Sequence, residues 1–140
     1  MRGPEEDASE DCVTEIEFEL TDPGYFFIGL ASDEGCRVRS DASLRLSTGE
    51  SIEFFTAFDC RFQAIRDRAM DVPSIDTCRV LAERGDEVVF RIDRTGRSIR
   101  ECLEGVGAIP TSIRATDGEG RVLAEVPAGA DARTVIGTFL

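Results

Sequence analysis

The sequence predicts an α+β fold made of two tandem ferredoxin-like (βαββαβ) halves with antiparallel sheets. Four short strand patterns, which open near residues 14, 51, 87 and 121, are each followed by a helix pattern at a near-constant interval. Turn-forming sequences lie between these repeats and are typical of hairpins. A βαβ unit takes roughly 35 residues, and two consecutive units make the ferredoxin-like motif. The chain therefore reads as a duplicated unit whose second half lacks its last strand.

The first repeat begins with a strand over residues 14–20, in which apolar residues alternate with glutamates. This alternation is typical of a strand with one buried and one solvated face. Residues 21–24 begin a helix that Gly35 ends. Its apolar stripe consists of Phe26, Phe27 and Leu30. A second strand opens at residues 36–39 and continues, after a break, to residue 46.

The second repeat follows a turn at residues 47–50. Its first strand covers residues 51–58, and Asp59 is the predicted N-cap of the next helix. The apolar positions of this helix have helical spacing and are Phe62, Ile65, Ala69 and Met70. Pro73 follows the helix, and residues 75–81 form the next strand.

The third and fourth repeats follow a tight turn at residues 84–86. A strand at 88–92 precedes a helix that starts near Ser98. Its apolar face consists of Ile99, Cys102, Leu103 and Val106. A strand at 109–115 and a hairpin turn at 117–120 lead to the last strand at 121–126. Asp131 is the predicted N-cap of a closing helix with Val135, Ile136, Phe139 and Leu140 on its apolar face.

These patterns divide the chain into an acidic, disordered arm at residues 1–11 and two halves at 12–83 and 86–140. The closing helix keeps an apolar face up to the last residue. Together with the missing strand, this favours a chain cut inside a domain over a natural terminus.

The composition narrows the function classes. The net charge of the 140 residues is −12, all sixteen basic residues are arginines, and lysine, histidine and tryptophan are absent. Such a surface repels nucleic-acid phosphate and stays hydrated when salt screens its self-repulsion. It indicates a salt-adapted proteome, the alternative being an ordinary acidic domain.

No apolar stretch approaches the about 20 residues of a membrane span and no signal peptide is evident, so we expect a cytoplasmic protein without membrane contact.

Four of the five cysteines fall on predicted apolar faces and read as small buried hydrophobes; they are Cys12, Cys36, Cys78 and Cys102. No C-x-x-C pair and no histidine is present, so the sequence predicts no metal site and no cofactor, although a site assembled from distant cysteines stays open. Cys60 differs, because it follows the predicted N-cap Asp59, where a helix N-terminus favours a thiolate. It is the candidate redox-sensing thiol.

No catalytic set is recognisable. The sequence has no nucleophile elbow, phosphate loop or dinucleotide loop, and most carboxylates fall on solvent faces or in turns. Without histidine, acid–base chemistry would depend on carboxylates, Tyr25 or a thiol. We therefore predict a regulatory or binding module rather than an enzyme, with no catalytic residues.

Five segments resemble one known family: residues 14–28, 34–38, 51–56, 118–127 and 130–135. They look like the domain that precedes the helix-turn-helix in haloarchaeal bacterio-opsin-activator-like (Bat-like) transcription regulators. The similarity covers nearly the whole chain from about Val13. In such regulators the domain commonly lies between a sensory GAF region, when one is present, and the helix-turn-helix.

The resemblance implies a non-catalytic sensor or coupling domain of a haloarchaeal transcription regulator, with DNA binding by a helix-turn-helix absent from this chain. Protein partners or self-association are expected, a small-molecule effector is compatible with this role, and no direct nucleic-acid contact is predicted for this segment. The alternative is a stand-alone ferredoxin-like protein that binds a small ligand or is an enzyme, including a thiol-based redox or metal sensor. The coding sequence beyond Leu140 discriminates the two, because a helix-turn-helix there supports the first.

Overall fold

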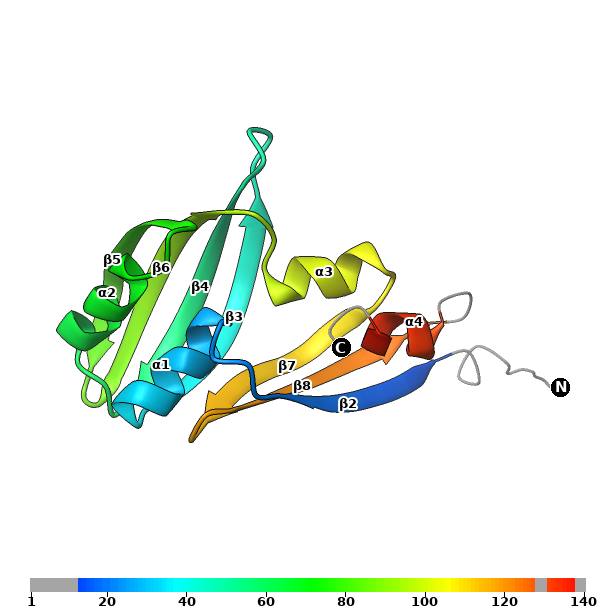
Figure 1. The fold of residues 1–140 in the computed structure, drawn as a ribbon, viewed down its shortest axis with the longest axis horizontal. Coiled ribbons are helices and arrows are strands. Elements are labelled where there is room, and N and C mark those ends of the chain that lie inside the picture. Colours follow the sequence, from blue (N-terminus) through cyan, green and yellow to red (C-terminus); the bar gives the residue numbers. More distant parts are fainter. Residues whose placement is uncertain (1–12, 128–130, 138–140) are drawn as a thin grey trace, which may run out of the picture.

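One antiparallel sheet with helices on one of its faces makes up the computed structural model, which describes residues 13–127 and 131–137 (Figure 1). The strands are β2 (Thr14–Leu20), β3 (Arg37–Arg45), β4 (Glu50–Phe58), β5 (Ile75–Arg84), β6 (Glu87–Thr95), β7 (Ile109–Thr116) and β8 (Glu119–Val126). The helices are α1 (Phe26–Glu34), α2 (Phe62–Met70), α3 (Ile99–Gly105) and α4 (Ala132–Gly137). The predicted order of strands and helices is confirmed across these residues. The predicted arm at 1–11, Cys12, Phe139 and Leu140 lie outside them.

The strand order corrects the predicted pair of sheets. A single seven-stranded sheet has the order β2-β8-β7-β3-β4-β6-β5, with every neighbouring pair antiparallel. In a self-contained βαββαβ motif the first strand lies between the third and the fourth. Here β6 takes that place between β4 and β5, and β2 pairs with β8 instead. Self-contained ferredoxin-like halves are therefore not confirmed, because the first strand of each half completes the sheet of the other.

The exchange gives the sheet an internal symmetry. Swapping β2 with β6, β3 with β7 and β4 with β8 reverses the order of these six strands. The symmetry centre is a short joint between β3 and β7, which pair only at Val38↔Ala115 and Arg39↔Arg114. Figure 1 shows the sheet bending strongly across this joint, with α1 to one side and α3 to the other. The next residues along the two strands, Ser40 and Ile113, lie beyond the last paired position.

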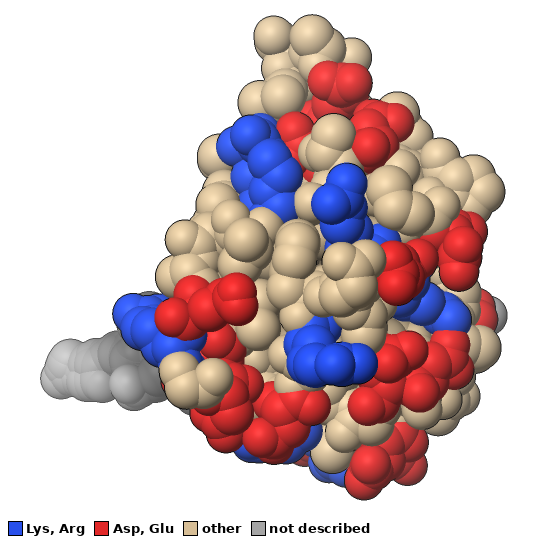
Figure 2. Space-filling view, turned by 90° about the vertical axis from the view of Figure 1, so that its left-hand side faces the viewer, with Lys and Arg blue, Asp and Glu red and all other residues tan. Residues whose placement is uncertain are grey.

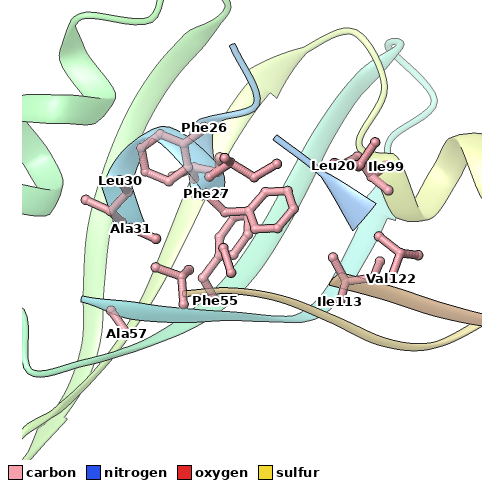
Figure 3. Close-up of a cluster of buried hydrophobic side chains, with 14 of the residues drawn as sticks. Leu20, Phe26, Phe27, Leu30, Ala31, Phe55, Ala57, Ile99, Ile113 and Val122 are labelled. Atoms are coloured by element: carbon pink, nitrogen blue, oxygen red, sulfur yellow. The ribbon is translucent and has the colours of Figure 1, made fainter. Parts of the chain in front are cut away.

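The core lies between the bent sheet and its helices. Phe26 and Phe27 of α1 pack on Phe55 of β4, with ring centroids 5.8 and 6.4 Å apart (Figure 3). Phe90 of β6 stacks on Phe55 at 5.4 Å. Aromatic rings bury large apolar areas and prefer such offset and edge contacts. This cluster fixes the start of α1 over the centre of the sheet.

The opposite face of the sheet is open and polar. Ion pairs join neighbouring positions there, including Arg91 with Asp93 at 2.7 Å and Arg121 with Glu17 and Glu19 at 2.9 Å each. Exposed pairs of this kind contribute little stability individually. Figure 2, which views the molecule from the side of α2 and β5, likewise shows acidic and basic side chains interspersed.

Two local predictions at α2 are wrong. The N-cap is Arg61, not Asp59, whose φ of 61° is left-handed. The Asp59 N–H donates to the Asp86 carbonyl oxygen at 2.9 Å, so Asp59 belongs to the turn after β4 and the helix starts later. Met70, predicted on the apolar stripe, is 48% exposed because it is the last residue of the helix.

The other helix signals agree with the structure. Gly35 ends α1 with a φ of 69°, a left-handed conformation that glycine adopts without steric cost. Ser98 is the N-cap of α3, and the Asp131 carboxylate accepts a hydrogen bond from the Arg133 N–H at the start of α4. Val135 of α4 is fully buried, as its predicted position on the apolar face requires.

Candidate functional site

A cavity of about 360 Å³ lies between the N-terminal ends of α1 and α3, over the point where β3 and β7 part. Ligand pockets in proteins start at about this size. The lining comes from the β2–α1 loop and α1 (Asp22, Gly24, Tyr25, Phe26, Phe27), from the sheet (Ser40, Glu53, Phe55, Arg94, Ile113) and from the segment that enters and forms α3 (Arg97, Ile99, Arg100, Cys102). Both exchanged halves of the chain therefore contribute to its walls.

The floor of the cavity is apolar and aromatic. Phe26, Phe27 and Phe55 are 4%, 5% and 2% exposed and hold one another in place through ring contacts (Figure 3). Ile99 and Ile113 add aliphatic walls. Because Phe55 is stacked on both Phe27 and Phe90, the floor is rigid and leaves little aromatic surface open to the cavity.

The start of α3 is fastened to the sheet by a polar network. The Ser98 hydroxyl accepts from the Glu101 N–H at 3.0 Å, and a Glu101 carboxylate oxygen accepts from the Ser98 N–H at 2.9 Å, which completes a capping box. The same oxygen accepts from the Ser51 hydroxyl of β4 at 2.7 Å, and Ser43 of β3 lies 3.1 Å from the Ser98 hydroxyl. This network fixes the direction in which α3 leaves the sheet.

Arg100 is the second residue of α3 and reaches back to β3. Its guanidinium donates to the carbonyl oxygen of Ser40 at 3.1 Å, while its Nε is buried without a hydrogen-bond partner among the described residues. Arg97, just before the helix, is exposed and makes no ion pair within the described part of the chain. Two guanidinium groups thus border the cavity with donors to spare.

Glu53 is a buried carboxylate in the cavity wall, only 6% exposed. Arg94 of β6 lies 3.2 Å from it and donates a hydrogen bond. Burial raises the pKa of Glu53 above its ordinary value, whereas Arg94 opposes this change. No sequence motif marks Glu53, although it shares the strand parity of the buried residues Phe55 and Ala57, which is the signal that could have found it.

The α1 end of the cavity has helix amides without a side-chain cap. Tyr25 is the N-cap, no side chain caps it, and the first turn has no acidic residue. Asp22 is engaged locally, because its carboxylate accepts from the Gly24 N–H at 2.8 Å. Burial and Asp22 raise the pKa of the Tyr25 hydroxyl. The helix end therefore presents its partial positive charge toward the cavity.

The candidate thiol Cys60 lies elsewhere, between β4 and α2. It precedes the N-cap Arg61, is half-buried and packs against the core, so its predicted place at the helix N-terminus and off the apolar faces is wrong. What the structure brings next to it is Cys36, at the entry to β3. A hydrogen bond between the two thiols raises the pKa of Cys36 and lowers the pKa of Cys60. No pattern in the sequence predicts that Cys36 and Cys60 lie next to each other.

The remaining described cysteines are separate. Cys78 is buried, which raises the pKa of its thiol to about 11. Cys102 borders the cavity and is half-buried, which also raises its thiol pKa.

Among the described residues, no cluster of three or more cysteine and carboxylate side chains is placed to hold a metal ion. No helix in that part of the chain has the length and apolarity that crossing a bilayer requires.

Comparison with known proteins supports the resemblance seen in the sequence. No curated protein and no solved structure matches the chain significantly. One family profile does match, over residues 11–139, and its description is BAT, "GAF and HTH_10 associated domain". Because this match spans almost the entire sequence, the chain belongs to the BAT family, the regulatory domain of Bat-like transcription regulators.

Proposed function

We propose that this domain is a non-catalytic effector sensor that couples a signal to transcription, with the cavity between α1 and α3 as its effector site. The observation that carries the proposal is that both exchanged halves line one cavity at the joint of the sheet. A ligand there would contact the start of α1, the start of α3 and the diverging strands at once. Its binding would therefore alter how the two halves pack, which is the property a coupling domain needs.

The family context supports this role. The family is described by its association with GAF and helix-turn-helix domains, which are sensory and DNA-binding modules. We infer that DNA contact belongs to a helix-turn-helix outside this chain. The net charge of −12 on these 140 residues opposes phosphate binding. A cytoplasmic, salt-adapted setting and contacts with other protein modules or a second copy fit the same proposal.

A cavity-filling substitution tests the effector role. Cys102→Phe places a ring at the cavity wall, whereas Glu104→Phe places the same ring on an exposed position of the same helix. In a reporter assay of the regulator that carries this domain, we expect Cys102→Phe to hold transcription at one level across signal conditions and Glu104→Phe to leave the response unchanged. An unaltered response in Cys102→Phe, with normal protein levels, would contradict the proposal.

The thiol pair favours a second candidate function. The neighbouring Cys36 thiol lowers the pKa of the Cys60 thiol, and Cys60 is half-exposed. A thiolate beside a second thiol is the arrangement that a peroxide or disulfide oxidant converts to a disulfide. Oxidation would tie the entry of β3 to the entry of α2. Cys60 therefore remains our candidate for redox sensing, with Cys36 as its partner.

A further inference from the structure

We propose that three arginines on the open face of the sheet, Arg37, Arg39 and Arg114, form a binding site for a phosphate group that lies across the β3–β7 joint. A pocket of about 240 Å³ marks the site. Its lining comes from β3 and β4 (Arg37, Val38, Arg39, Phe58) and from β7 (Arg114, Ala115, Thr116). None of these residues lines the α1–α3 cavity, so the inference goes beyond the proposed function.

The charge of this pocket is opposite to that of the molecule. Its lining has three arginines and no carboxylate. In the whole chain, acidic residues outnumber basic ones by 28 to 16. The local field of the arginines therefore attracts an anion to the joint, whereas the rest of the surface repels one.

The register of the joint places like charges directly opposite each other. Arg39 of β3 pairs with Arg114 of β7, which pairs in turn with Arg121 of β8. Directly opposite residues project from the same face with Cβ atoms about 4.5–5.5 Å apart, and like charges at such positions destabilise a sheet. The joint has only two residue pairs, so one of the two carries this repulsion. An anion bound between Arg39 and Arg114 would relieve it.

Arg114 is the member of this row without a carboxylate partner among the described residues. Arg39 and Arg121 have such partners, at 2.7 and 2.9 Å. The exposed guanidinium of Arg114 donates from Nε to the Ser112 hydroxyl at 3.1 Å, and its two terminal nitrogens have no partner in the described part of the chain. Those nitrogens carry four N–H donors for a ligand.

Phe58 holds the other two guanidinium groups at the pocket. The Cζ atoms of Arg37 and Arg39 lie 4.8 and 5.5 Å from the centre of its ring, which are cation–π contacts. Arg39 uses Nε and Nη2 on neighbours in β3 and β4 and keeps Nη1. Arg37 is 3.7 Å from Asp59, but both side chains are more than half exposed, so this ion pair is weak. Donors from both strands are thus available.

The arrangement of donors favours a phosphate group. Its tetrahedral oxygens point in several directions and can accept from β3 and β7 at once, whereas the two oxygens of a carboxylate lie in one plane and match a single guanidinium. Thr116 adds a hydroxyl at the rim. At about 240 Å³ the pocket is smaller than typical sites for whole organic ligands. It has room for the phosphate group, and any organic remainder would extend into solvent.

The experiment is calorimetric titration of the 140-residue chain with inorganic phosphate and with glycerol 3-phosphate, at constant ionic strength, with acetate as the control anion. We expect saturable binding of a phosphate probe and at least tenfold weaker binding of acetate. Tighter binding of glycerol 3-phosphate would assign the site to phosphomonoesters, and equal or tighter binding of inorganic phosphate would assign it to the free ion. Failure of both probes to bind, or equal binding of acetate, would overturn the proposal.

Arg114→Ala separates this site from a general effect of salt. Without phosphate, we expect the variant to unfold at a higher temperature than the parent, because a repelling charge is removed. Its phosphate affinity should fall at least tenfold, as the loss of charge-assisted hydrogen bonds implies, and phosphate should no longer raise its unfolding midpoint. Unchanged phosphate affinity, or a lower midpoint without phosphate, would refute the site.

Two further variants are controls. Arg84 is also an exposed strand arginine but lies opposite Glu87, so Arg84→Ala should bind phosphate like the parent. Cys102→Phe fills the α1–α3 cavity and should also leave phosphate binding unchanged. Loss of phosphate binding in Cys102→Phe would place the anion in that cavity and overturn the assignment to the joint.

Discussion

At the scale of single residues, the positions that matter most are polar groups that the fold has buried or paired. Glu53, Glu101 and Ser98 are all nearly inaccessible, and each has partners in a different chain segment. Buried polar groups are retained at a cost unless their hydrogen bonds are satisfied. Their pairing across β4, β6 and α3 is what gives the cavity walls a defined geometry.

The buried carboxylate of Glu53 predicts a pH dependence of stability. Its pKa is raised by burial, and it faces Arg94 from β6 and Glu101 and Arg100 from α3. A raised carboxyl pKa means that the folded state binds the proton more tightly than the unfolded chain. Its contribution to stability is therefore present at low pH and is lost as pH rises from the ordinary value of 4.5 through the raised one.

We expect Glu53→Gln to flatten the stability profile above this ordinary pKa, because the amide does not titrate. Urea unfolding followed at several pH values measures it, and Glu83→Gln, at an exposed position near the end of β5, is the control. A slope that is the same in Glu53→Gln and the parent would show that Glu53 does not titrate in this range.

The thiol pair predicts selective reactivity. We expect iodoacetamide to label Cys60 before the other described cysteines, since it is half-exposed and its pKa is lowered by the Cys36 thiol. Cys36→Ala removes that hydrogen bond, so the pH at which Cys60 labels should rise. Mass spectrometry of the native, reduced protein at each cysteine gives the rates, with Cys78→Ala as control. Labelling of Cys60 only after denaturation would rule out both the pair and the redox-sensing idea.

At the scale of elements, local signals predicted most of the fold correctly. The alternation in β2, the helix start near Ser98 and the turns near Gly35 and Gly118 each depend on a few neighbouring residues, and each is found in the structure. The error at Asp59 has a physical origin as well. Its N–H is taken by Asp86, a partner that no local pattern identifies.

The pairing of distant strands was beyond the sequence signal. Hairpin turns specify that β3 pairs with β4 and β7 with β8, but nothing in the pattern of β2 specifies β8 rather than β4 as its partner. Both β4 and β8 offer an apolar face of matching parity, so the choice depends on the whole sheet. The cavity depends on the same choice, which is why Arg97, Arg100 and Glu53 did not stand out together.

The cap of α3 gives a prediction at this scale. Ser98→Ala removes the N-cap hydroxyl and its contact with Ser43, and we expect a loss of about 1–2 kcal/mol in the free energy of unfolding. Denaturant unfolding measures it, and Thr48→Ala in the exposed β3–β4 turn should cost less. If Ser98→Ala unfolds at the same denaturant concentration as the parent, the capping network does not hold α3.

At the scale of the whole molecule, the net negative charge is the property with the largest expected effect on stability. The chain has 28 acidic against 16 basic residues, so an excess of twelve negative charges is left even if every arginine pairs with one carboxylate. Salt weakens both the repulsion and the pairs. Because exposed pairs contribute at most about 1 kcal/mol each, relief of the net repulsion should prevail.

We therefore expect the unfolding midpoint to rise with KCl between 0.1 and 1 M, as the screening length falls from about 10 to about 3 Å. A variant with Glu15, Glu83 and Asp86 neutralised to their amides should show a smaller rise, because it starts with less repulsion. A midpoint that falls with KCl would mean that the ion pairs matter more than the net charge.

The exchange of first strands sets an order of events during synthesis. Glu17 and its ion-pair partner Arg121 are 104 residues apart, and at roughly 5–20 residues per second a ribosome needs about 5–20 s to add that length. Throughout this time β2 has emerged while β8 has not. A waiting strand with Ile16 and Leu20 exposed is prone to pair with the wrong chain. We infer that Glu17 and Glu19, which lie between these two residues, hinder association of β2 with other chains while the protein is being synthesised. Once Arg121 of β8 has been added, it neutralises these two carboxylates by pairing with them.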